Sequence, residues 1–435
     1  MAQFVCSNCG YGAGSWYGKC PGCGEWNTFT QFNPEAGAST ERKQEKVQKL
    51  TPTSLAQIPS LNKDRKSTGI FEFDRVLGGG FVAGEVILLT GEPGIGKSTL
   101  LLQSLQNLKT LYISGEEAGE QIKERAVRLG VKLDNLLFAD TLQLEGILDG
   151  LDSLKSTIEM VVIDSIQTIY SKQIEGQPGS VSQLKEVTNR LIIFAKQNKL
   201  PMMLVGHVTK DGDIAGPKTV EHMVDAVLAF EGEKVSHFRI LRAQKNRFGS
   251  TDEIGIFAME QEGLVQIDNP LAFLDDQSQT VPGKAIIGVM EGKRPLFFEI
   301  QALAAPTVLA IPRRVVNGVD YNKVLLLLAV IRKNLHLPLD KFDIYINVIG
   351  GVNVKSTAAD LGITAATISS IENIPLPPSS LFIGEVGLLG EIRKVFGEDK
   401  VIKEAKRLTF KNIYSSSAIK HIRDLKKTAS AFSSH

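Results

Sequence analysis

The segment with the clearest chemical assignment is Gly91-Glu92-Pro93-Gly94-Ile95-Gly96-Lys97-Ser98-Thr99. It fits the pattern GxxxxGK(S/T), in which glycines let backbone N–H groups surround a phosphate and the following helix adds positive charge. In such a loop Lys97 contacts the β- and γ-phosphates, and the Ser98 hydroxyl binds Mg²⁺. An apolar segment precedes the loop and a helical pattern follows it. We therefore predict that this loop binds ATP with Mg²⁺.

Polar side chains end three further predicted strands. The segment Met160-Val-Val-Ile-Asp164 ends with a carboxylate, a pattern typical of a residue that holds Mg²⁺ through water. Glu116 and Glu117 follow a strand; a carboxylate there could act as general base toward water, or could lie in solvent at a helix start. His207 also ends a strand, where ligands of open parallel sheets bind. A packing role is the alternative for His207, but we predict that it senses the γ-phosphate.

All the cysteines of the chain lie near its start, with the spacing C-x2-C-x10-C-x2-C: Cys6, Cys9, Cys20 and Cys23. Two thiolates separated by two residues can bind one tetrahedral ion, and the glycines after each pair leave N–H groups free to donate to sulfur. A disulfide or a redox pair is the alternative, but neither a secretory signal nor a βαβ pattern accompanies the cysteines. We predict a structural Zn²⁺ site whose small core contains Trp16, Tyr17, Trp26 and Phe29; the alternative is that these side chains are exposed and serve a partner.

The elements that must position these residues alternate between strand and helix from residue 69 onward. We predict strands at 85–90, 110–114, 160–163 and 201–206, and helices at 98–108, 121–129 and 181–197. This alternation implies an α/β fold with a parallel sheet covered on both faces. Beyond residue 269 the pattern becomes α+β, with strands at 281–290, 296–302 and 342–348 and a helix at 324–335.

The amino-acid composition and net charge exclude several classes of protein. The 435 residues are 43% hydrophobic and 22% charged, which excludes wholesale disorder, and the net charge of +1 excludes a uniformly basic nucleic-acid coat. The longest apolar run, 324–331, is too short to span a bilayer, and the N-terminus does not resemble a signal peptide. We expect a cytoplasmic protein with a zinc module (1–30), a flexible linker (31–66), an ATPase domain (67–268) and a C-terminal domain (269–435).

Taken together, these motifs resemble those of the RadA/Sms family of bacterial recombination proteins. That family has a four-cysteine zinc module, a RecA-like P-loop ATPase core and an α+β Lon-protease-like C-terminal domain in this order. The most specific feature is Lys245-Asn-Arg247-Phe-Gly249, and segments 206–210 and 214–225 are also similar. The resemblance implies that Glu116 activates water, with Glu117 as the alternative, and that His207 occupies the sensor position.

The resemblance also suggests a role for the cations at 245–249. From chemistry alone, Lys245 and Arg247 could be the solvated tip of a hairpin. In the family they resemble cationic fingers that reach the nucleotide of a neighbouring subunit and stabilise charge on its γ-phosphoryl group. A finger supplied in this way implies a homo-oligomer, and we expect a hexameric ring.

The C-terminal domain resembles a protease that has lost its catalytic residues. In the alignment with Lon, the serine nucleophile corresponds to Ala358 and its lysine partner to Asp399. Ser356 and Lys400 lie close to these positions, so a shifted register is the alternative. Acyl transfer needs a hydroxyl beside a base, so we predict no peptidase activity and a role in assembly and DNA contact.

The family implies an ATP-dependent DNA motor of homologous recombination and repair. It would bind single-stranded and branched DNA and promote branch migration with RecA. Candidate DNA contacts are Lys210 and Lys218, near the predicted sensor strand, and Arg313 and Arg314. The alternative is a slow, ATP-switched adaptor that recruits repair partners through its zinc module.

Overall fold

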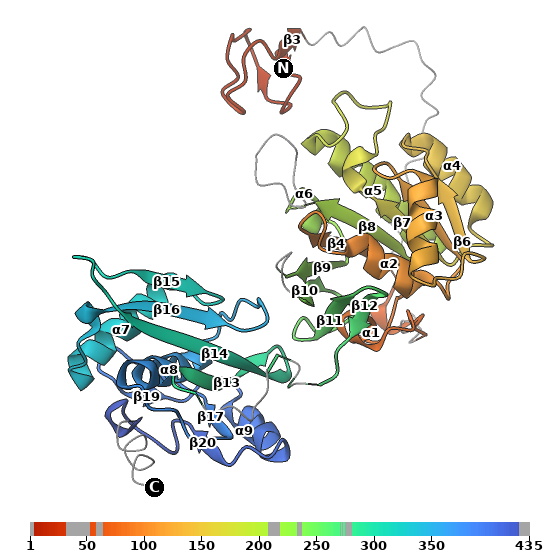
Figure 1. The fold of residues 1–435 in the computed structure, drawn as a ribbon. Helices are drawn as coiled ribbons and strands as arrows, with labels where there is room; N and C mark the ends of the chain where they lie inside the picture. Colours follow the sequence, from red (N-terminus) through yellow and green to blue (C-terminus); the bar gives the residue numbers. More distant parts are fainter. Residues whose placement is uncertain are drawn as a thin grey trace, which may run out of the picture.

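Three folded units follow one another along the chain in the computed structural model (Figure 1). The structure describes residues 4–31, 53–57, 64–207, 218–232, 237–269, 271, 273–274 and 281–425. They correspond to the predicted zinc module, the predicted ATPase domain and the C-terminal domain. Arg65 and Lys66 lie within the predicted linker (31–66) but contact the ATPase domain. Arg65 donates to the carbonyl oxygens of Leu77 and Gly80, and Lys66 pairs with Glu159.

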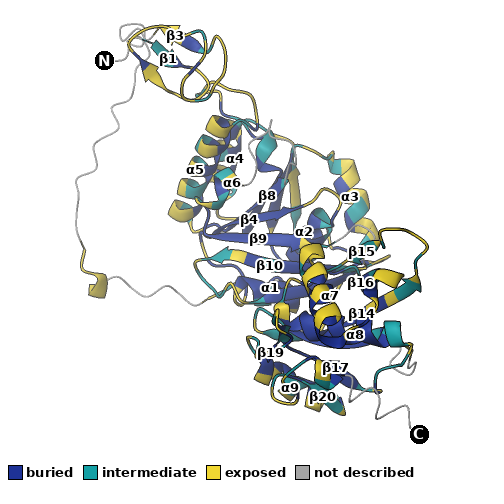
Figure 2. Ribbon diagram, turned by 90° about the vertical axis from the view of Figure 1, so that its left-hand side faces the viewer, coloured by how far each residue is buried: buried dark blue, intermediate teal, exposed yellow. Residues whose placement is uncertain are grey.

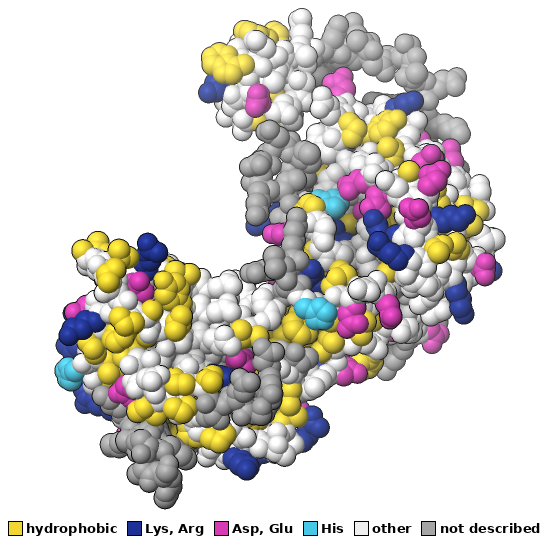
Figure 3. Space-filling model, in the orientation of Figure 1, with side chains coloured by type: hydrophobic (Ala, Val, Ile, Leu, Met, Phe, Trp, Pro, Cys, Tyr) yellow, Lys and Arg dark blue, Asp and Glu magenta, His cyan; other side chains and the backbone are white. Residues whose placement is uncertain are grey.

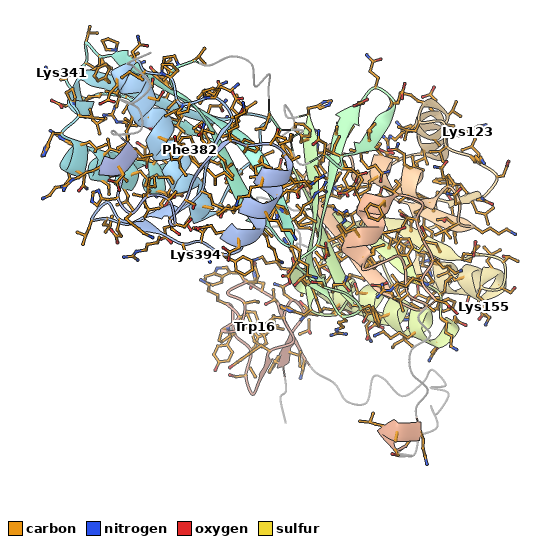
Figure 4. All side chains as sticks on the ribbon, turned by 90° about the horizontal axis from the view of Figure 1, so that it is seen from below. Trp16, Lys123, Lys155, Lys341, Phe382 and Lys394 are labelled. Carbon is orange, nitrogen blue, oxygen red and sulfur yellow. The ribbon has the colours of Figure 1, made fainter. Side chains whose placement is uncertain are left out.

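The zinc module is a three-stranded antiparallel sheet in the order β2-β1-β3, formed by β1 (Phe4–Cys6), β2 (Gly12–Ala13) and β3 (Phe29–Gln31). Its buried cluster contains Cys6, Ala13, Cys20 and Phe29. Of the predicted aromatic core only Phe29 is buried; Trp16, Tyr17 and Trp26 are exposed, and Trp16 projects from the surface (Figure 4). The prediction was wrong for these three because so short a segment has little interior beyond its cysteines.

The ATPase domain is built on a nine-stranded sheet in the order β12-β11-β10-β9-β4-β8-β7-β5-β6. The strands from β9 to β6 in this order are parallel. Their bounds are β4 (Val86–Gly91), β5 (Thr110–Ser114), β6 (Leu136–Ala139), β7 (Met160–Asp164), β8 (Met202–His207) and β9 (Ala226–Glu231). The predicted strands are thus confirmed, and β6 and β9 are additional.

Helices cover both faces of this sheet, as predicted, and their exposed sides face outward (Figure 2). One buried cluster contains residues of α1 (Phe71–Leu77), α2 (Lys97–Leu105) and α3 (Gly119–Arg128). The cluster on the other face contains residues of α4 (Leu144–Leu154) and α5 (Val181–Asn198). Short helical segments are η1 (Leu55–Gln57), η2 (Ile166–Thr168) and α6 (Lys218–Glu221).

The sheet continues as three antiparallel strands, which the sequence analysis did not predict. They are β10 (Phe238–Asn246), β11 (Ile254–Glu260) and β12 (Gly263–Gln266). Three cations interrupt the apolar pattern of β10, and tertiary contacts satisfy each of them. Arg239 donates to the carbonyl of Ile95, Arg242 pairs with Glu291, and Lys245 donates to the carbonyl of Val224.

The C-terminal domain contains a six-stranded mixed sheet in the order β15-β16-β14-β13-β17-β20. The strands are β13 (Lys284–Glu291), β14 (Arg294–Pro306), β15 (Arg314–Asn317), β16 (Phe342–Val348), β17 (Ser380–Phe382) and β20 (Asn412–Tyr414). A two-stranded ribbon pairs β18 (Glu385–Val386) with β19 (Ile392–Arg393). The helical segments are α7 (Tyr321–Leu335), η3 (Leu339–Lys341), η4 (Thr357–Ala359), α8 (Asp360–Glu372) and α9 (Glu398–Arg407). The predicted α+β pattern is confirmed.

The turn between β13 and β14 fixes the C-terminal domain to the ATPase domain. A Cβ on Gly292 (φ +61°) would lie 1.8 Å from the carbonyl oxygen of Asp252, so only glycine permits this close approach. Two residues later, Arg294 lies 2.8 Å from the buried carboxylate of Glu72 in α1. Burial raises the pKa of Glu72, and the positive charge of Arg294 opposes that shift. The two domains therefore share a buried ionic contact.

We expect Arg294→Met to lower the free energy of unfolding by about 3 kcal/mol, because the Glu72 carboxylate stays buried with one cation fewer. Urea denaturation followed by circular dichroism measures this loss. The control is Lys293→Met, which removes the neighbouring, half-exposed pair with Glu253 and should cost no more than about 0.5 kcal/mol. Equal losses in both variants would contradict the assignment.

Candidate nucleotide-binding and catalytic site

The predicted phosphate loop joins the end of β4 to the start of α2. Gly96 caps the helix with a φ of +112°, and a Cβ there would lie 2.7 Å from the side chain of Met259. From the far side, the buried side chain of Arg239 donates to the carbonyl oxygen of Ile95 at 3.1 Å. Sequence reasoning missed Arg239, although an arginine within the apolar part of β10 was a usable signal. Met259 and Arg239 thus confine the loop where it enters α2.

Lys97 lies within the curve of this loop and is almost fully buried. Its Nζ donates to the carbonyl oxygens of Gly91 and Glu92 at 2.9 and 3.1 Å, and lies 3.3 Å from His207 Nδ1. Burial lowers the pKa of Lys97, while Asp164 and Glu116 oppose this change. A phosphate oxygen is a stronger partner for an ammonium than a carbonyl is, so this position suits the β- and γ-phosphates.

Asp164, which we predict to hold Mg²⁺ through water, lies beside the start of α2. Its Oδ2 accepts hydrogen bonds from the hydroxyls of Ser98 at 3.0 Å and Tyr112 at 2.6 Å. Burial raises the pKa of Asp164, and these two hydrogen bonds oppose the shift. Tyr112 is a second residue that the sequence analysis missed, because a tyrosine in an apolar strand indicates only packing. Ser98 and Asp164 are hard oxygen donors that fit Mg²⁺.

Glu116, rather than Glu117, faces this site. Its Oε2 lies 3.1 Å from His207 Nε2, and its Oε1 accepts a hydrogen bond from Ser165. This close polar contact with His207 is the main reason that the pKa of Glu116 is lowered. Glu117 instead binds both guanidinium nitrogens of Arg125, at 2.6 and 2.8 Å. A carboxylate that stays ionised beside the phosphate loop can accept a proton from water.

The structure brings together the predicted residues Glu116, Asp164 and His207. Ligand atoms of these three lie within 4.8 Å of one another. They come from the ends of three neighbouring parallel strands, β5, β7 and β8. Mg²⁺ held near Ser98 and Asp164 would neutralise phosphate charge, and the carboxylate and the imidazole border the same space.

Lys245 and Arg247 lie away from Glu116, Asp164 and His207, at the opposite ends of the parallel strands. Asn246 pairs with Ala226, which in turn pairs with Ile87 at the beginning of β4. Lys245 Nζ donates to the carbonyl oxygens of Glu221, His222 and Val224, and its pKa is lowered, chiefly by burial. Arg247 pairs with Asp225 and is half exposed. The structure therefore does not bring the predicted fingers to the phosphate loop of the same chain.

The four cysteines converge as predicted. The Sγ atoms of Cys6 and Cys23 are 3.7 Å apart and those of Cys9 and Cys20 are 3.6 Å apart, while a tetrahedral ion with Zn–S bonds of about 2.3 Å needs about 3.8 Å. Their side chains thus fit Zn²⁺. The expected donation from the glycines after each pair differs in detail. Gly10 and Gly24 donate to the carbonyl oxygens of Cys6 and Cys20, and it is Gly22 whose N–H points to sulfur.

The remaining predicted positions are dispersed. Lys210 lies outside the described residues, Lys218 is exposed at the start of α6, and Arg313 is exposed. Arg314 is a weak candidate for DNA contact, because its guanidinium donates to three carbonyl oxygens of its own domain. Two of these oxygens belong to Leu339 and Phe342, so the cation connects β15 to η3 and β16.

Ala358 is buried in η4, and Asp399 is an exposed partner of Lys394 on α9. In the alternative register, the Ser356 oxygen accepts from the N–H of Ala358, and Lys400 is exposed on α9.

Comparison with known proteins decides the family. The chain is 46% identical over 95% of its length to the DNA repair protein RadA of Bacillus subtilis, and covers 92% of that protein. It is 44% identical to the DNA repair protein RadA of Aquifex aeolicus, over 94% of this chain and 91% of that protein. The chain belongs to the RadA family. The predicted resemblance to the RadA/Sms family is thereby confirmed.

Two parts of this RadA-family chain also match domain families. Residues 66–155 match the KaiC family of ATPases, and residues 4–31 match a rubredoxin-type metal-binding domain. A solved RadB recombinase is similar over 46% of this chain and 99% of its own, with 23% identity and a TM-score of 0.38. The predicted RecA-like ATPase core and its cofactors ATP, Mg²⁺ and Zn²⁺ are confirmed. Among the described residues, no helix is both long and apolar enough to cross a bilayer.

We expect Glu116→Gln to lower ATP hydrolysis by about 100-fold, because the amide cannot accept a proton from water. ATP binding should change little, since Lys97 and Ser98 are retained; turnover and equilibrium binding of a fluorescent ATP analogue measure the two effects. The matched control is Glu117→Gln, which should keep most of the activity because Glu117 binds Arg125. A larger loss in the control would assign the general base to Glu117.

Removal of zinc should unfold the zinc module alone. The chain has two tryptophans, and both Trp16 and Trp26 lie in this module, so tryptophan fluorescence reports on it selectively. We expect a chelator selective for Zn²⁺, used with Mg²⁺ in excess, to lower the fluorescence anisotropy, because the thiolates lose the ion that joins them, while ATPase activity persists. Zn²⁺ should restore the anisotropy and Mg²⁺ should not. Unchanged anisotropy after metal removal would show that zinc does not organise the module.

Proposed function

We propose that this protein is a DNA-dependent ATPase and motor of homologous recombination and DNA repair. It would bind single-stranded and branched DNA and promote branch migration together with RecA. Its relatives are DNA repair proteins, which supports the general role. The single observation that carries the proposed mechanism is that the ATP site and the cationic fingers, Lys245 and Arg247, lie at opposite ends of the central strands.

The length of β4 sets the distance between these two edges. Asn246, the residue before Arg247, is in register with Ile87 of β4 through Ala226 of β9. The phosphate loop begins at Gly91, four residues further along β4, and four residues of a strand span about 13 Å. An arginine side chain does not extend that far along the sheet. Arg247 is half exposed, so it is available to another protomer. We therefore propose that Arg247 acts on the nucleotide of a neighbouring subunit.

Such a contact is heterologous, because the ATP site of one subunit meets Arg247 of the next, and these are different surfaces of the chain. If the rotation closes, the result is a ring, and we propose a hexamer. Hydrophobic side chains also reach the surface of the C-terminal domain (Figure 3). Leu303, Val308 and Ile311, on and after β14, are exposed and would be covered by a neighbouring subunit. This domain thus supports assembly.

Proteolysis is disfavoured. At the position of the nucleophile, Ala358 has no hydroxyl and is buried, and at the position of the base Asp399 is an exposed acid. The alternative serine, Ser356, uses its oxygen to cap η4. We propose that the domain serves assembly and DNA contact, without peptidase activity.

A second candidate function is an ATP-switched adaptor. The exposed aromatic side chains Trp16, Tyr17 and Trp26 favour it, because aromatic groups on a small module are typical of protein interfaces. ATP hydrolysis and unwinding of a forked DNA distinguish the two functions. The motor requires that DNA stimulates ATPase activity and that the protein, but not Lys97→Ala, separates the fork. Stimulation by a protein partner alone, without unwinding, would favour the adaptor.

The trans action of Arg247 predicts complementation between two inactive variants. Lys97→Ala loses its own ATP site but keeps its finger, whereas Arg247→Ala keeps the ATP site and loses the finger. In a random equal mixture, about a quarter of the interfaces combine an intact site with an intact finger, so about a quarter of the wild-type ATPase rate should return. Each variant alone is the control. No recovery in mixtures that demonstrably co-assemble would exclude action in trans.

A further inference from the structure

A single buried carboxylate, that of Asp225, contacts both Arg247, the proposed finger, and β4, the strand that leads into the phosphate loop. Asp225 precedes β9 and is almost fully buried. Its Oδ2 accepts a hydrogen bond from the N–H of Val86 at 3.1 Å, and Val86 is the first residue of β4. Its Oδ1 lies 3.3 Å from Arg247 Nη1 and 3.1 Å from Lys196 Nζ. Asp225 is therefore the point where β4, α5 and the finger meet.

The backbone around Asp225 strengthens this connection. The N–H of Asp225 donates to the carbonyl of Val86, and the N–H of Arg247 donates to the carbonyl of Asp225, at 2.9 and 3.0 Å. The neighbouring carbonyl of Val224 accepts from Lys245. Both cations of the finger segment are thus held by residues 224 and 225.

Electrostatics gives Asp225 a directing role. A buried carboxylate needs cationic or N–H partners, and here two cations and one N–H supply them. Arg247 remains half exposed although one of its nitrogens faces Asp225. The carboxylate therefore orients the guanidinium at the surface without enclosing it, and such orientation lowers the entropy lost when the arginine binds an external phosphate.

We propose that Asp225 is a positioning residue for Arg247 and links the ATP site of one protomer to the finger that it offers to the next. The inference rests on the proposed trans action of Arg247. Its physical path is short, because β4 begins at the N–H that Asp225 accepts and ends at the phosphate loop. Displacement of the loop by nucleotide would reach the finger through one strand and one carboxylate.

Asp225→Asn tests this role, since the asparagine oxygen still accepts from Val86 while the charge that holds Arg247 is lost. We expect the ATPase rate at saturating ATP to fall about tenfold or more, with unchanged affinity for ATP. The matched control is Lys196→Met, which removes the other cation on Asp225 and should keep most of the activity. Should Asp225→Asn fail to fold, Asp225→Ser replaces it, because its hydroxyl also accepts from Val86.

Mixtures with Lys97→Ala separate the outcomes. If Asp225 positions the finger, Asp225→Asn has an intact ATP site and recovers activity when Lys97→Ala supplies fingers. If Asp225 instead supports the ATP site of its own chain, no mixture recovers, although Arg247→Ala with Lys97→Ala does; this result overturns the inference and leaves trans action standing. Wild-type activity of Asp225→Asn alone also overturns it. Failure of both mixtures rejects the proposed trans action itself.

Discussion

The fixed length of a β-strand is the constraint on which the mechanism of this protein depends. β4 is fully buried between β9 and β8, so its two ends keep their separation. One end opens into the phosphate loop, and the other receives Asp225, with Arg247 attached to it. The phosphate loop and Arg247 therefore do not meet within one chain. Catalysis in trans follows from this geometry as a proposal, and it makes assembly a condition of efficient turnover.

The connection between the ATPase domain and the C-terminal domain is ionic as well as steric. Arg294 of the C-terminal domain forms an ion pair with the buried Glu72. Arg242 of the ATPase domain pairs with Glu231 of its own domain and with Glu291 of the C-terminal domain. Ion pairs buried between domains lose much of their stabilisation when their geometry changes. The two domains are thus suited to move as one body.

Much of the site could be predicted because its motifs are local. A phosphate loop needs glycines, a lysine and a hydroxyl within a few residues, and a zinc site needs two close cysteine pairs, so both are legible in the chain. The antiparallel strands β10 to β12 were missed because their charged residues disguise the apolar pattern. Tertiary partners far along the chain, such as Ile95 for Arg239, remove the cost of burying those charges.

The sequence by itself determined the family, the cofactors and the alternating α/β core, and it predicted which residues would contact phosphate. Only the tertiary structure decided that Glu116 and not Glu117 faces the ATP site. It also decided that the Arg314 guanidinium binds carbonyl oxygens of its own domain, and that Asp225 contacts both β4 and Arg247. The reason is physical. Local motifs fix the conformation of a few consecutive residues, whereas these outcomes depend on strand order, which brings distant segments to the same edge of a sheet.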